Sequence, residues 1–119
     1  MSGECELCRL DELADGTSKG IIVTPGAHYA DVILVRRGAE VYAWRNCCPH
    51  TGAPMEWQAD QFLDYTGEYL QCGIHGALFR VDDGYCLRGP CVRQRLYSIA
   101  VVVRDGRVIA LDADSLPRR

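Results

Sequence analysis

The stretch that decides the fold of this chain covers residues 48–55 and reads CPHTGAPM. A related pattern, CGIH, follows at residues 72–75, so one half contributes C-x-H and the other C-x-x-H. Gly52 and Gly76 follow the two histidines, and glycine lets the backbone turn tightly and pass close to a bound group. The two halves together provide two thiolates and two imidazoles, from Cys48, His50, Cys72 and His75. We therefore expect these four side chains to form a metal centre.

Two kinds of metal centre use such a donor set. Two thiolates on one iron and two neutral imidazoles on the other are the mixed ligation of a Rieske [2Fe–2S] cluster. A Cys2His2 structural zinc site uses the same four donors, but it usually pairs like ligands as C-x-x-C and H-x-x-x-H. Here each half supplies one cysteine and one histidine, which favours iron and sulfide. A zinc-bound interaction module stays open as an alternative.

Cys47 lies next to a candidate ligand and competes with it. Adjacent side chains of an extended segment point to opposite faces, so only one of Cys47 and Cys48 can face a cluster. We take Cys48, because it belongs to the C-x-H step. Cys47 is then expected to point away from the metal.

The other cysteines have no clear ligand role. The chain has seven cysteines, a high number for 119 residues, which in a reducing compartment points to metal or redox chemistry before disulfides. Cys5 and Cys8 form a C-x-x-C step with no second such step to complete a metal site, so we expect buried or unpaired thiols in a first strand. Cys86 and Cys91 are expected to be small packed thiols. His28 has no Cys or His neighbour in the sequence and is expected at the surface.

Short apolar segments separated by turns predict an antiparallel all-β sandwich or small barrel. Asp105-Gly106 favours a tight primed turn between two strands. Helical turns are expected only at residues 10–13 and 60–63. The expected strands cover residues 21–24, 31–36, 41–44, 98–103 and 108–111. Between the two hairpins, residues 46–91 break the strand pattern and carry most of the Cys and His residues, so we expect residues 1–119 to form a single domain with its site there.

Composition excludes several function classes. The formal net charge is -3 and the pI is about 5.5, which argues against binding to nucleic acid or to an anionic membrane surface. No apolar run is long enough to span a bilayer, and the N-terminus lacks a signal-peptide pattern, so we expect a cytoplasmic protein. We find no nucleotide-binding glycine loop and no room for a catalytic domain, so we expect no small-molecule substrate and no turnover by the chain alone.

The strings at residues 48–55 and 72–96 resemble the cluster-binding loops and the following proline loop of Rieske proteins, above all the small free-standing Rieske-type ferredoxins of bacteria. The resemblance is sharp over residues 44–97. It implies a three-sheet antiparallel β fold with a cluster-binding subdomain at about residues 46–91, and one [2Fe–2S] cluster per chain. Cys48 and Cys72 would hold the buried iron, His50 and His75 the outer iron. Residues 89–91 would lie over the cluster.

The same resemblance implies a one-electron carrier. It would take an electron from a flavin reductase and pass it to a terminal oxygenase or a similar enzyme, through the edge at His50 and His75. We expect an apolar contact rim around that edge, made of Pro49, Pro54, Met55 and Pro90. A small subunit of an assimilatory, nitrite-type reductase is the alternative within this fold, although such subunits often lack the ligands.

Differences from high-potential Rieske proteins imply a low potential. Those relatives carry a disulfide between the two loops, and this chain has Ala53 and Ile74 at the matching positions. They also place a serine and a tyrosine after the second histidine, where this chain has Ala77 and Phe79. Lost hydroxyl donors remove stabilisation of the reduced cluster. We therefore expect a midpoint below about 0 mV, in the lower part of the Rieske range.

Overall fold

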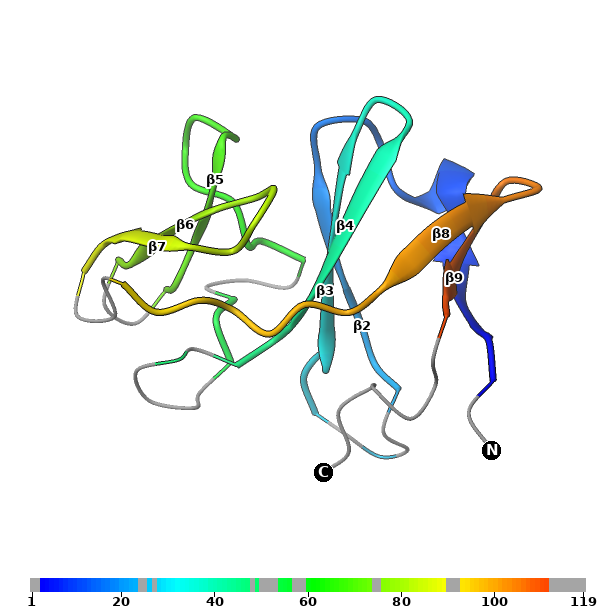
Figure 1. Ribbon diagram of the computed structural model, residues 1–119, viewed down its shortest axis with the longest axis horizontal. Helices are drawn as coiled ribbons and strands as arrows, with labels where there is room; N and C mark the ends of the chain where they lie inside the picture. Colours follow the sequence, from blue (N-terminus) through cyan, green and yellow to red (C-terminus); the bar gives the residue numbers. More distant parts are fainter. Residues whose placement is uncertain are drawn as a thin grey trace.

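The structure is a computed structural model that describes residues 3–23, 26, 28–47, 49, 54–56, 60–73, 76–89 and 93–111. In these residues, the chain forms three antiparallel sheets of three strands each and one short 3-10 helix, η1 (Leu10–Glu12) (Figure 1). The predictions of an all-β antiparallel fold with three sheets and of a helical turn at residues 10–13 are confirmed.

The central sheet consists of β2 (Ser18–Ile21), β3 (Val32–Arg37) and β4 (Glu40–Arg45), in the order β2-β3-β4. It lies between the other two sheets in Figure 1. Alternate side chains of a strand point to opposite faces, and β3 is buried on both: Ile33 and Val35 enter one core, while Val32 and Leu34 enter the other. The run of four apolar residues in β3 therefore reflects two cores, one on each side.

The second sheet has the order β1-β9-β8 and contains β1 (Cys5–Arg9), β8 (Val101–Arg104) and β9 (Arg107–Ala110). Asp105 and Gly106 connect β8 to β9 with φ angles of 53° and 72°. Positive φ at both central residues is the mark of a type I′ turn. The predicted primed hairpin turn is therefore confirmed.

The third sheet lies on the opposite side of the central sheet (Figure 1) and has the order β5-β6-β7. It contains β5 (Tyr69–Gln71), β6 (Leu78–Arg80) and β7 (Cys86–Arg88). The turn between β6 and β7 packs on the indole of Trp44, because a Cβ on Gly84 would lie 2.7 Å from that ring. The expectation of a break in the strand pattern here is wrong, since the strands of three residues are too short to show a period in the sequence.

Three predicted segments differ from the structure. The strand predicted at residues 21–24 lies earlier, at Ser18–Ile21, and the one predicted to start at residue 98 starts at Val101. The helical turn predicted at residues 60–63 is wrong. Phe62 donates its backbone N–H to Ser18 Oγ (3.2 Å), and Leu63 forms a β-bridge with Leu70, so tertiary contacts hold this segment extended. Among the described residues, no helix has the length and apolar character that crossing a bilayer requires.

Candidate metal centre

Cys72 is the one predicted ligand that the structure describes. It follows β5 directly, and its side chain is fully buried, with 0% exposure. Cys48, His50 and His75 lie outside the described residues, as do Gly52, Ala53, Ile74, Pro90 and Cys91. The ligand set therefore stays a prediction, and the structure describes the residues that flank the three other ligands.

Cys72 begins a tight turn between β5 and β6. The backbone N–H of Cys72 donates to the carbonyl of Ala77 (2.9 Å), and the N–H of Gly76 donates to the carbonyl of Cys72 (2.9 Å). Gly76 has a φ of +68°, a left-handed conformation that glycine adopts without strain. These hydrogen bonds fix Cys72, the first residue of the C-x-x-H pattern, against Gly76 and Ala77, which follow the pattern.

The segment that carries the C-x-H pattern is closed at its base by a residue that sequence reasoning missed. Asn46 follows β4 and is buried, and its Oδ1 accepts a hydrogen bond from the backbone N–H of Met55 (2.7 Å). This bond joins the two ends of residues 46–55. The only sign of this role of Asn46 in the sequence is that a polar residue stands immediately before the cysteine pair.

A further hydrogen bond joins the two halves. The backbone N–H of Gly73 donates to the carbonyl of Met55 (2.8 Å). Gly73 follows Cys72, and Met55 ends the CPHTGAPM string. The structure therefore brings the base of the C-x-H segment against the turn of the C-x-x-H segment, as a shared site requires.

The chain after β7 passes directly beside the second turn. A Cβ on Gly89 would lie 2.8 Å from Cα of Ala77, and Gly89 has a φ of +105°. Only glycine allows both this approach and this backbone conformation. The start of the segment expected to cover the cluster is thus placed against the residue that ends the Cys72 turn.

The predicted contact rim needs one correction. Met55 is fully buried, in the core that also contains Cys72, Ala77 and Phe79. An apolar side chain at the joint between two loops packs inward, so Met55 supports the loops and offers no surface to a partner. Pro49 and Pro54 are partly exposed, in agreement with a rim.

The described residues fit a cluster held by two converging loops. The buried Cys72 thiol, the left-handed Gly76 and the close approach at Gly89 supply a donor and a backbone that can lie near a bulky group. The hydrogen bond from Gly73 to Met55 supplies the convergence.

The cysteines of β1 fit a structural role. Cys8 is buried and Cys5 half-buried, and both are free thiols. Burial, followed by the negative charge of Glu12, raises the pKa of the Cys8 thiol, so it stays protonated and is a poor metal ligand. No three Cys, His, Asp or Glu side chains gather as a metal site within the described residues.

Cys86 and His28 lie as the sequence predicts. Cys86 is buried, as expected, and its thiol donates to the carbonyl of Arg88 (3.2 Å). His28 is exposed, also as expected. Cys47 is half-buried, and its orientation relative to Cys48 stays a prediction because Cys48 lies outside the described residues.

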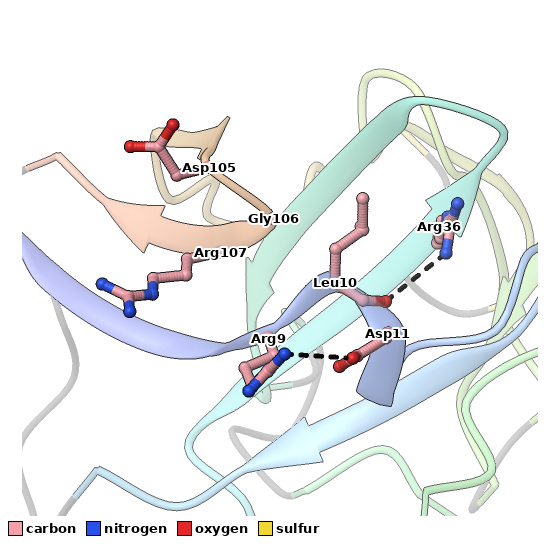
Figure 2. Close-up of a pocket in the computed structure, with 7 residues that line it drawn as sticks. All are labelled: Arg9, Leu10, Asp11, Arg36, Asp105, Gly106 and Arg107. Carbon is pink, nitrogen blue, oxygen red and sulfur yellow. Dashed lines mark hydrogen bonds and ion pairs between the residues drawn. The ribbon is translucent and has the colours of Figure 1, made fainter.

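A surface cavity of about 380 Å³ lies elsewhere, beside η1 and the β8–β9 turn, on the opposite side of the central sheet from β5, β6 and β7 (Figures 1 and 2). Its lining contains three arginines: Arg9 pairs with Asp11 (3.3 Å), Arg36 donates to the carbonyl of Leu13 (3.0 Å), and Arg107 pairs with Glu6 (3.4 Å). The guanidinium groups of Arg9 and Arg107 are thus each paired with a carboxylate, and that of Arg36 is held in place by backbone carbonyls. The full lining is Arg9, Leu10, Asp11, Arg36, Asp105, Gly106 and Arg107.

Comparison with known proteins decides the family. The Rieske [2Fe-2S] domain family model matches residues 4–111. This chain belongs to the Rieske family. No match was found among curated proteins.

Solved structures agree with this assignment. The ferredoxin of carbazole 1,9a-dioxygenase from Nocardioides aromaticivorans IC177 is 25% identical over 92% of this chain and 98% of that chain, with a TM-score of 0.71. A ferredoxin–oxygenase complex of carbazole 1,9a-dioxygenase contains a chain that is 26% identical over 91% and 92% of the two chains, with a TM-score of 0.70. A putative NADH-dependent nitrite reductase small subunit from Mycobacterium tuberculosis is 26% identical over 92% and 95%, with a TM-score of 0.66.

The Rieske assignment and the [2Fe–2S] cofactor are therefore confirmed. This Rieske protein is an electron-transfer protein, because the cofactor of its family is a redox cluster.

Proposed function

We propose that this Rieske protein is a low-potential ferredoxin that carries single electrons from a flavin reductase to a terminal oxygenase or similar enzyme. Its ligands are Cys48, His50, Cys72 and His75, on a cluster-binding subdomain at about residues 46–91 of a single domain. The observation that carries the proposal is the hydrogen bond from Gly73 to Met55, which holds the C-x-H and C-x-x-H segments together.

The burial of Cys72 suits a ligand of the inner iron. A fully buried thiolate is stable only when a metal or a hydrogen-bond donor compensates its charge. His50 and His75 would hold the outer iron, nearer the surface. When bound, the cluster accepts and releases one electron; the chain keeps it in place, shields the Cys72 side from water and offers the partly exposed Pro49 and Pro54 to a partner.

The oxygenase partner is supported by similarity. A chain with the same fold, 26% identical to this one, was solved in a complex of reduced oxygenase and oxidized ferredoxin. A nitrite reductase small subunit has comparable similarity and is the alternative. The sequence retains all four ligand residues, which favours the carrier over that subunit.

Metal and acid-labile sulfide analysis of the purified chain tests the cofactor. We expect about two iron and two sulfide per chain, as a [2Fe–2S] centre requires. One zinc and no sulfide would support the Cys2His2 interaction module instead. Adding a flavin reductase with NADH, then a Rieske oxygenase, tests the carrier: the cluster should be reduced by the first and reoxidised by the second.

The reduction potential is expected below about 0 mV against hydrogen, in the lower part of the Rieske range. Ala77 and Phe79 are fully buried beside Cys72 in the same core, and neither side chain has a hydroxyl to donate to a sulfide or thiolate. The extra negative charge of the reduced state is therefore less stabilised. A redox titration followed by absorbance checks this, and a midpoint above about +100 mV would contradict it.

A further inference from the structure

The carboxamide of Asn46 is buried between residues 30–31, which precede β3, and residues 55–56, at the end of the C-x-H segment. It is 1% exposed, and its hydrogen bonds reach two segments, residues 30–31 and residues 55–56. Its backbone N–H donates to the carbonyl of Asp31 (2.9 Å), Nδ2 donates to the carbonyl of Ala30 (2.9 Å) and to Glu56 Oε1 (2.7 Å), and Oδ1 accepts from the N–H of Met55 (2.7 Å).

These bonds need an amide side chain. Asn46 uses both N–H donors of Nδ2 and accepts a hydrogen bond at Oδ1, a combination of donors and acceptor that a carboxamide provides. An aspartate has the same shape, but it would place an oxygen against the carbonyl of Ala30 and the carboxylate of Glu56. An alanine would leave the buried N–H of Met55 without this acceptor, and an unpaired buried amide is destabilising.

The bonds of Asn46 also reach the second half-site. Met55, whose N–H is held by Asn46, accepts a hydrogen bond from Gly73 through its carbonyl (2.8 Å). Gly73 follows Cys72. On the other side, Ala30 and Asp31 lead into β3, the central strand that is buried on both faces. Asn46 therefore connects the C-x-H segment directly, and the Cys72 turn through Met55, to the start of the central strand.

We propose that Asn46 is a positioning residue, which sets the distance and orientation between the Cys48–His50 half and the Cys72–His75 half of the centre. The inference rests on the proposed function, since it requires a cluster bridging the two segments. A positioning role makes one demand that a purely structural role does not: altering Asn46 must change the geometry of the bound cluster in the folded protein.

The test compares Asn46→Asp with Ser18→Ala in the full chain. Ser18 Oγ donates to the carbonyl of Asp60 (2.7 Å) and accepts from the N–H of Phe62 (3.2 Å), so it also links the central sheet to another segment, but outside the two ligand segments. Both variants are expected to lower the melting temperature. Only Asn46→Asp should shift and broaden the electron paramagnetic resonance signal of the reduced cluster, and raise the rate of cluster loss by roughly tenfold or more.

Glu56→Ala serves as a second, milder variant should Asn46→Asp not fold. It removes one of the two acceptors of Nδ2 and leaves the bond to Met55 in place, so a smaller shift in the same signal is expected. Two results together would overturn the positioning role. The first is a wild-type signal in both Asn46→Asp and Glu56→Ala, or in Glu56→Ala alone if Asn46→Asp does not fold. The second is a rate of cluster loss that follows the melting temperature, as in Ser18→Ala. Zinc without sulfide in the wild type would overturn the proposed function, and this inference with it.

Discussion

Replacing Cys72 by alanine is expected to abolish cluster binding, with iron and sulfide falling from about two each per chain to near zero. Cys72 is fully buried at the base of a turn whose ends are fixed by hydrogen bonds to Ala77 and from Gly76. No other described thiol lies in this turn, so no neighbour can take its place there. Iron and sulfide analysis and the visible absorbance of the purified variant measure the result.

Cys8→Ala is the matched control, because Cys8 is also a buried cysteine but lies in the other core. It should keep the full iron and sulfide content and lose only packing. The same measurement decides which of the adjacent residues Cys47 and Cys48 is the ligand: Cys48→Ala should lose the cluster, and Cys47→Ala should keep it. Wild-type iron content in Cys72→Ala would remove Cys72 from the ligand set.

Gly84→Ala is expected to destabilise the protein by about 2–4 kcal/mol, through two effects that add. Gly84 has a φ of +71°, which costs about 1 kcal/mol for a residue with a Cβ. Its Cβ would also lie 2.7, 3.0 and 3.2 Å from three atoms of the Trp44 ring, and overpacking of this kind costs about 1–3 kcal/mol. The ring cannot move aside easily, because it is buried in the core between the central sheet and the third sheet.

Gly67→Ala separates the two effects. Gly67 has a nearly equal φ of +76°, but nothing lies within 4 Å of its Cβ position. It should lose only about 1 kcal/mol, the cost of the backbone conformation. Urea denaturation of both variants, monitored by circular dichroism, measures the difference. Equal losses would show that Trp44 does not constrain the β6–β7 turn.

Strong local patterns made part of the fold predictable. The hairpin at the C-terminus follows from Asp105-Gly106, whose turn type depends on two adjacent residues. The strands of the third sheet were missed because three residues show no period, and they are held by pairing with one another and by packing on Trp44. The helical turn predicted at residues 60–63 does not form, because Ser18 and Leu70, which hold this segment extended, lie outside it in the chain.

For the candidate site too, local motifs were predictable and contacts between distant residues were not. The ligand types and their pairing as C-x-H and C-x-x-H are local, so the sequence by itself favoured an iron–sulfur cofactor and the Rieske class of protein. Only the tertiary structure revealed that Asn46 closes one segment, that Met55 is buried and joins it to the other, and that Gly89 passes against Ala77. These contacts join residues from different parts of the chain, and their energies depend on burial and on distances that only folding creates. The chemistry of the centre is therefore encoded in short motifs, while its assembly depends on hydrogen bonds between distant segments.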